Sequence, residues 1–262
     1  ERFFKEITGV FDLRLSRDAA QNVGEQGSIT IYDIAVIPSA QRRFLLEGIL
    51  SESRAIESVS FFTPEGREIE RMERSRPVVP EREFVDASRL EKFIKPRAGE
   101  RYISPVRYTL EGSRITVASP VRNAAQDVIG VLAGDVLLKP VERSIARGVL
   151  GNAGYLLLVT DSAELITASV RDSSAHPALR DIGLVASVVA GATRTGLEDA
   201  DRYTSFWGER VIGAGAHLET LPFAIVAEWP EADALELTRT LSQQALAFSL
   251  ATLLGVFLLS IL

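Results

Sequence analysis

The chain has 262 residues, of which 46% are hydrophobic, and this is enough for two modest domains or one large one. The net charge of -6 and the pI near 5.2 argue against nucleic acid as a partner, because that would call for a concentrated basic face. The sequence has no cysteine and two histidines, His176 and His217, so disulfides, thiolate catalysis and a histidine-rich metal site are not expected. We therefore expect neither a metal nor a cofactor.

Residues 1–55 are predicted to form a long N-terminal helical stalk. Apolar residues recur at spacings of three and four between Phe4 and Leu15, with charges between them, which is typical of an amphipathic helix. Pro38 is favourable in the first turn of a helix, and a second helical stretch is predicted over residues 39–50.

The pattern changes to period two in residues 56–147, which we expect to form a first module. Strands are indicated by "IESVSFF" and "REIERMER", on either side of a turn at Thr63–Gly66 where proline and glycine favour chain reversal. A short helix, "DASRLEKFIKP", is predicted next, then a hairpin, "YISPVRYTLEGSRITVASPV", and a last strand, "DVIGVLAGDVLL". This order predicts an α+β module, in which helices pack on one face of an antiparallel sheet.

Residues 148–230 repeat this order and are expected to form a second module. The turn at Thr160–Ala163 aligns with the turn at Thr63–Gly66, and Glu228 aligns with Asp135 near the end of the last strand. Because the two alignments need nearly the same offset, they indicate duplication of one α+β module of roughly 95 residues.

The C-terminal segment indicates a membrane protein. Residues 245–262 read "ALAFSLATLLGVFLLSIL" and carry no charge, over roughly the length at which a transmembrane helix becomes credible. An exit helix over residues 231–244 is expected to connect the second module to this segment. The chain has no initiator methionine, so we expect a fragment of a longer protein, with a first membrane helix upstream.

Several stretches of the sequence, in their order, are similar to one known family. They are "GERYISPV", "ITVASPVRN", "VIGVLAGDVLL", "GNAGYLLLVTDSAELITAS" and "FAIVAEWPEADAL". With the stalk, the two modules and the membrane helix, nearly the whole chain resembles the double Cache sensor domain of bacterial transmembrane receptors. One departure concerns tryptophan: double Cache sensors of amino acids carry a Trp-Tyr pair in the distal module, whereas Trp207 and Trp229 lie in the second module here.

The resemblance implies two tandem PAS-like Cache modules, the first of them distal to the membrane, in a receptor of the sensor histidine kinase, nucleotide cyclase or chemoreceptor type. It implies a homodimer in the bacterial inner membrane, with residues 1–244 periplasmic. It implies no enzymatic activity for this part, the missing cytoplasmic part being a histidine kinase or a nucleotide cyclase. A small organic acid or another anion is expected to bind in the distal module and to transmit a conformational change through the membrane helix.

The first module offers suitable groups for such a ligand. A guanidinium from Arg74 or Arg107 can bind a planar carboxylate through paired hydrogen bonds. The phenol of Tyr102 can add an apolar wall and one donor, and Asp135 can meet a cation. The candidate ligand-binding set is completed by Ser119 and Arg71.

Strand alternation sorts these candidates between the two faces of the predicted sheet. In a regular strand Arg74 shares a face with Met72 while Arg71 lies on the other face, so a bulge would be needed to turn both inward. By the same alternation, Arg107 is expected on the face opposite Tyr102.

Other interpretations are consistent with the same residues. The arginines of the first hairpin can make exposed ion pairs with its glutamates, and Asp135 can cap the helix that follows it. The chain can also sense a periplasmic protein without a small ligand, or act as a membrane-anchored hydrolase that uses acids such as Asp135 and Glu228. Against a hydrolase, the sequence has no Gly-x-Ser-x-Gly, Walker or HExxH motif.

Overall fold

The computed structural model describes residues 9–11, 33–110, 112–148, 153–169, 177–194, 200–218 and 221–233. The predicted membrane helix, most of the predicted stalk and His176 lie outside these ranges. Within the described residues, no helix is long and apolar enough to cross a membrane. The chain divides into two compact units, here called the first and the second unit, with the boundary between Arg143 and Ser144 and with residues 220–222 assigned to the first unit.

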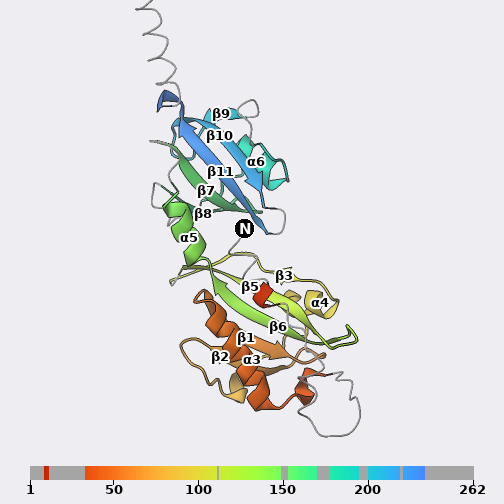
Figure 1. The fold of residues 1–262 in the computed structure, drawn as a ribbon. Coiled ribbons are helices and arrows are strands. Elements are labelled where there is room, and N and C mark those ends of the chain that lie inside the picture. Colours follow the sequence, from red (N-terminus) through yellow and green to blue (C-terminus); the bar gives the residue numbers. More distant parts are fainter. Residues whose placement is uncertain are drawn as a thin grey trace, which may run out of the picture. The chain divides into compact units, whose positions relative to one another are not determined.

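The first unit is built on a six-stranded antiparallel sheet (Figure 1). The strands lie in the order β2-β1-β6-β5-β3, and β4 pairs with β5 beside β3. Their bounds are β1 (Ile56–Phe62), β2 (Glu68–Glu73), β3 (Tyr102–Ile103), β4 (Arg107–Thr109), β5 (Gly112–Arg122) and β6 (Val128–Leu137). The β1–β2 hairpin turns at Thr63–Gly66 as predicted, because Gly66 can adopt the φ of +93° that the turn requires.

The helices of this part of the chain differ in length, and α3 has 14 residues. They are η1 (Ile34–Val36), α3 (Ser39–Glu52), η2 (Glu81–Glu83), α4 (Glu91–Arg97) and α5 (Lys139–Ala146). The predicted helix at residues 39–50 is confirmed by α3, which Pro38 precedes as the N-cap residue. The helix predicted to start near Asp86 begins only at Glu91, because the Asp86 carboxylate accepts a hydrogen bond from the backbone of Ser88 and forms a turn instead.

Helices α3 and α4 cover opposite faces of the first sheet, so the prediction of helices on one face was wrong. Arg43 of α3 donates a hydrogen bond to the buried carboxylate of Glu70, which lies opposite Phe61 in the sheet. Phe93 of α4 belongs instead to a buried cluster with Phe62. Since neighbouring residues of a strand point to opposite faces, Phe61 and Phe62 mark the sides that the two helices occupy.

The second unit has a five-stranded antiparallel sheet in the order β8-β7-β11-β10-β9, and helix α6 packs on β10 and β11. The bounds are β7 (Tyr155–Thr160), β8 (Leu165–Ala168), α6 (Gly183–Val189), β9 (Asp201–Thr204), β10 (Arg210–His217) and β11 (Phe223–Pro230). Its buried core is apolar and includes Leu157, Val159, Leu184, Val185, Val188 and Val226. Burial of this α6 face against the sheet is what holds so short a helix in place.

The two sheets repeat one topology, as the sequence alignment predicts. Their strand orders agree when β2, β1, β6, β5 and β3 are matched with β8, β7, β11, β10 and β9. Asp135 pairs across the sheet with Ser58, and Glu228 pairs with Tyr155 on the corresponding strand. The predicted alignment of Asp135 with Glu228 is therefore confirmed.

Candidate functional site

The first unit contains a cavity of about 220 Å³ on the face of its sheet that α4 covers. Polar and charged side chains dominate the lining. The lining residues are Ser58, Ser60, Glu68, Arg71, Glu73, Val85, Lys92, Thr116, Ala133, Gly134 and Asp135. This cavity is the candidate ligand site, because a concave space with a few convergent polar groups is the usual form of a small-molecule pocket.

A β-bulge in β2 decides which charges of the first hairpin reach the cavity. Glu68 pairs with Phe62 and Glu70 pairs with Phe61, so the strand accommodates Ile69 as an extra residue. The bulge places Glu68 on the cavity face together with Arg71, and leaves Glu70 on the face of α3.

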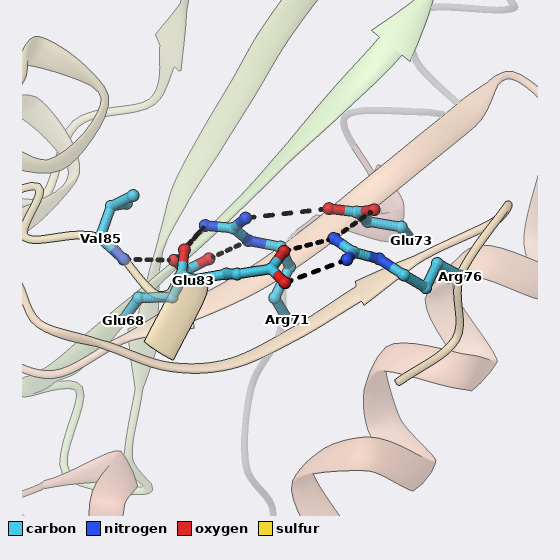
Figure 2. A network of polar contacts seen from close by, with 6 residues as sticks. All are labelled: Glu68, Arg71, Glu73, Arg76, Glu83 and Val85. Carbon is cyan, nitrogen blue, oxygen red and sulfur yellow. Dashed lines mark hydrogen bonds and ion pairs between the residues drawn. The ribbon is translucent and has the colours of Figure 1, made fainter. Parts of the chain in front are cut away.

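Arg71 lies in the cavity wall but is already bound by protein groups (Figure 2). Its guanidinium forms a two-point ion pair with buried Glu68, in which Nε donates to Oε1 at 2.7 Å and Nη2 donates to Oε2. A further bond runs from Nη2 to the carbonyl of Glu83 at 3.3 Å, and Glu73 lies 3.8 Å away. The hydrogen bond to Glu68 raises the pKa of Arg71. Arg71 therefore supplies little free hydrogen-bonding capacity to a ligand.

The same network fastens the segment after β2 beside the cavity. The carboxylate of Glu68 accepts a hydrogen bond from the backbone of Val85 at 2.8 Å, and Val85 itself lines the cavity. Farther out, Arg76 donates to Glu83 at 2.7 Å and lies 3.4 Å from Glu73 (Figure 2). Arg76 belongs to an exposed network, which is the alternative interpretation of the hairpin arginines, and it does not line the cavity.

Asp135 lines the cavity from the centre of the sheet. Its Oδ1 accepts hydrogen bonds from Arg107 at 2.7 Å and from the hydroxyl of Thr116 at 2.7 Å. Within the described part of the chain, its Oδ2 has no hydrogen-bond partner. Asp135 is thus held in one orientation while one carboxylate oxygen stays available to a ligand.

Lys92 is the cation that sequence reasoning missed. It comes from α4 and lines the cavity, and its ammonium lies 5.3 Å from the centre of the Phe62 ring. Among the described residues it has no hydrogen bond or ion pair. Burial lowers the pKa of Lys92, while the charge of Asp135 acts in the opposite direction. The only sequence signal was its place beside Phe93, the residue that anchors α4 to the sheet.

The structure does not place Arg74 or Ser119 in the cavity. Arg74 follows β2 on the α3 side, and its guanidinium donates to the backbone carbonyls of Leu50, Ser53 and Ile56. It therefore completes the C-terminal end of α3, whose last carbonyls lack partners within the helix. Ser119 is buried on the face opposite the cavity, because it alternates with Ala118 of the cavity-side cluster.

Tyr102 and Arg107 lie on one face of the sheet, and the prediction of opposite faces was wrong. Tyr102 pairs with Ala118, and Arg107 reaches Thr116 on the same side. Residues 104–106 belong to neither β3 nor β4, so strand alternation does not continue between the two. Tyr102 packs against the cluster below α4 without lining the cavity, and burial raises its pKa.

The described residues contain no group of three histidine, aspartate or glutamate side chains that could hold a metal ion. Besides Arg71, which pairs with Glu68 and Glu73, the lining combines one unpaired ammonium, one half-used carboxylate and hydroxyl groups. Such a set can bind a small charged molecule by hydrogen bonds and ion pairs.

Comparison with known proteins identifies the fold. No family model matches the chain, and no curated protein matches it. Among solved structures, the ligand-binding domain of the Campylobacter jejuni chemoreceptor Tlp3 in complex with L-norvaline is similar with a TM-score of 0.63 at 13% identity, covering 90% of this chain and 85% of that one.

Extracellular domains of proteins described as histidine kinases are similar as well. For rpHK1S-Z16 the TM-score is 0.55 at 14% identity, over 76% of this chain and 80% of that one. For mmHK1S-Z3 it is 0.60 at 15% identity, over 78% and 83%. The chain therefore has the fold of extracytoplasmic sensor domains of the double Cache type, the type that its sequence resembles.

Proposed function

We propose that this chain is the extracytoplasmic sensing part of a transmembrane signalling receptor, and that its first unit binds a small molecule bearing a carboxylate. One observation carries the proposal: the ammonium of Lys92 faces a polar cavity and has no ion-pair partner among the described residues. A partly buried charge is costly unless it is paired, so a ligand carboxylate would complete this site.

The other lining groups define what else the ligand can carry. The hydroxyls of Ser58 and Ser60 can donate to a carboxylate held by Lys92. Oδ2 of Asp135 can accept from an ammonium, so a zwitterion also fits. A volume of about 220 Å³ lies below the range for drug-sized ligands, so the ligand should be a small molecule.

The similar structures support this class of function at the level of fold. Tlp3 domains were solved with L-norvaline, isoleucine and L-valine, which are small molecules carrying a carboxylate and an ammonium. At 13% identity they do not specify the ligand of this chain. What they support is a sensor domain, with catalysis belonging to another part of the receptor.

Transmission of the signal is part of the same proposal. A ligand can shift the first unit between conformations only through different affinities for them. The change would pass through the second unit and residues 231–244 to the predicted membrane helix at residues 245–262. The receptor would act as a homodimer in the bacterial inner membrane, with residues 1–244 on the periplasmic side.

A thermal-shift and calorimetric screen of the purified chain tests the ligand class. The screen would contain small monocarboxylates, dicarboxylates, amino acids and amines. A ligand at about 100 times its Kd should stabilise the folded state by about 2.7 kcal/mol. Lys92→Met should abolish binding of every carboxylate that the wild type binds. Lys95→Met is the matched control, because this lysine of the same helix lies over the ring of Tyr102 and does not line the cavity.

Asp135→Asn separates the two ligand classes. If the ligand is a zwitterion, this variant should lose binding as Lys92→Met does, because the amide no longer attracts an ammonium. If the ligand is a simple organic acid, Asp135→Asn should bind it at least as well as the wild type. Full binding by Lys92→Met would refute the site, and a screen without any hit would favour sensing of a periplasmic protein.

A further inference from the structure

The second unit carries an acid at the position that Asp135 occupies in the first. Glu228 on β11 pairs with Tyr155 on β7 and with Gly213 on β10. Asp135 on β6 pairs in the same way with residues of β1 and β5. Asp135 and Glu228 are equivalent in backbone position, so the surroundings of the two side chains can be compared directly.

Glu228 is fully buried, with an exposed fraction of 0%. Its Oε1 accepts a hydrogen bond from the hydroxyl of Tyr203, whereas its Oε2 is buried without a hydrogen-bond partner. Two further buried oxygens, the Tyr155 hydroxyl and Ser205 Oγ, also lack a partner of ordinary hydrogen-bond geometry. Tyr155 is nevertheless close enough to both Glu228 and Ser205 to interact with them. Unpartnered buried polar atoms are uncommon, and here three of them gather around one carboxyl group.

Aromatic rings fill the space around this carboxyl group. The Tyr203 ring packs against Gly213, where a Cβ would lie 2.6 Å from its Cε1 atom. The Trp207 ring stands edge-on to the Tyr155 ring at 5.1 Å. The site is therefore sealed by large side chains and excludes solvent from Glu228.

No positive charge compensates Glu228 within the described residues. The groups that face it are Tyr155 from β7, Tyr203 from β9, and Ser205 and Glu209 from the β9–β10 turn, while α6 contributes apolar side chains. Glu209 carries the same sign of charge as an ionised Glu228. A buried carboxylate without a counter-charge is strongly disfavoured, and binding a proton removes that cost.

A proton would also complete the hydrogen bonds. Tyr203 already donates to Oε1 of Glu228. With the carboxyl group protonated, Oε2 can donate to the Tyr155 oxygen, and the Tyr155 hydroxyl can donate to Ser205 Oγ. The three unpartnered oxygens then form one chain of donors and acceptors.

We propose that Glu228, Tyr155, Tyr203 and Ser205 form a buried proton-binding site, through which the second unit responds to the pH outside the membrane. This input is separate from the ligand site of the first unit and needs no ligand there, but its exposure to the pH outside the membrane rests on the extracytoplasmic location proposed above. Protonated, the site is neutral and fully hydrogen-bonded. Ionised, it holds an uncompensated charge that loosens the packing of β9 and the β9–β10 turn against β11.

The direction of the pH effect follows from burial. Burial raises the pKa of Glu228, and the hydrogen bond from Tyr203 offsets part of this rise. The folded chain therefore keeps the proton at pH values where the unfolded chain has released it. The stabilisation is fully present below the ordinary glutamate pKa of about 4.3 and is lost as the pH rises through the folded-state pKa.

The test follows the melting temperature of the purified chain from about pH 5 to about pH 8, which lies above the ordinary pKa of a glutamate. The wild type should melt at lower temperature as the pH rises. Glu228→Gln, which copies the shape and hydrogen bonds of the protonated acid, should remove this dependence and melt higher than the wild type at the upper end. Glu164→Gln, the same change at a partly exposed acid of this unit, should behave as the wild type. An infrared band of a protonated carboxyl group should be present at the lower end and absent from Glu228→Gln.

Three results would overturn the proposal. One is that the wild type and Glu228→Gln melt at the same temperature at every pH, and that the wild type shows no protonated-carboxyl band. Another is stabilisation at the upper end of the range by potassium or ammonium chloride over choline chloride, because that would make the site a cation site. Tyr203→Phe gives a third check should Glu228→Gln fail to fold. Without the hydrogen bond from Tyr203, the pKa of Glu228 should rise further, so the fall in melting temperature should occur at higher pH. A fall at the same pH as in the wild type would contradict the proton site.

Discussion

Asp135 in the first unit and Glu228 in the second lie at the same place in two sheets of one topology, with opposite surroundings. Asp135 keeps 30% of its side chain exposed, borders a cavity and is bound by Arg107. Glu228 is sealed from solvent, and the group that donates to it is the phenol of Tyr203. Position in the duplicated sheet sets where the acid lies, while the neighbouring strands decide its solvation and its partner.

Two neighbouring positions account for most of this difference. Across from the acid, the first unit has Ser58, whose small side chain leaves the cavity open, and the second has Tyr155, whose ring fills the space. On the other side, Thr116 donates a hydrogen bond to Asp135, whereas Gly213 leaves room for an aromatic ring. One acid borders a polar cavity, and the other is closed off from water.

The largest effect is expected where the two hairpin turns differ. Gly66 has a φ of +93°, and a Cβ there would lie 2.6 Å from the Cα of Ser88, so Gly66→Ala should cost about 2–4 kcal/mol of unfolding free energy. Ala163 holds the corresponding place with a φ of +59°. Ala163→Gly should change the unfolding free energy by less than about 1 kcal/mol. The relief of backbone strain in the folded state offsets the greater conformational freedom that glycine gives the unfolded chain. Urea unfolding of both variants measures the contrast, and equal costs would contradict it.

A smaller effect is expected from giving the second unit the residue of the first. Gly213→Thr places a side chain into the ring of Tyr203 and the side chain of Leu184, and should destabilise the second unit by about 1–3 kcal/mol. Hydrogen exchange of β9 and β10 would locate the loss. If the variant kept wild-type protection, the aromatic seal around Glu228 would not be tightly packed.

The smallest effect concerns the ligand-free stability of the first unit. Because burial lowers the pKa of Lys92, stability should rise with pH between that lowered pKa and the ordinary lysine value of about 10.4. Lys92→Met should remove this rise and change stability by less than about 1 kcal/mol at neutral pH. The sign is opposite to that expected for Glu228, so melting curves of Lys92→Met and Glu228→Gln over pH should separate the two units. A Lys92→Met profile identical to wild type would show that the ammonium is well solvated.

The candidate site was predictable where the strands are regular. Asp135 lies in a long central strand, so simple alternation placed it with Ala133 on the cavity face. Alternation correctly separated Arg74 from Arg71, because β2 is regular beyond the bulge at Ile69. It did not predict which of the two faces carries the cavity, because that depends on where α3 and α4 pack. Arg107 was assigned to the wrong face because a break between β3 and β4 is invisible to periodicity.

By itself, the sequence determined the α+β class, the duplicated order of strands and the first hairpin, since these depend on local alternation and on glycine and proline in turns. Only the tertiary structure decided which charges share a cavity. Lys92 and Asp135 line the same cavity because α4 packs on one particular face of the sheet. Arg71 forms an ion pair with Glu68 because the strand bulges between them. Such meetings depend on how separate elements pack in space, which no pattern within a single element encodes.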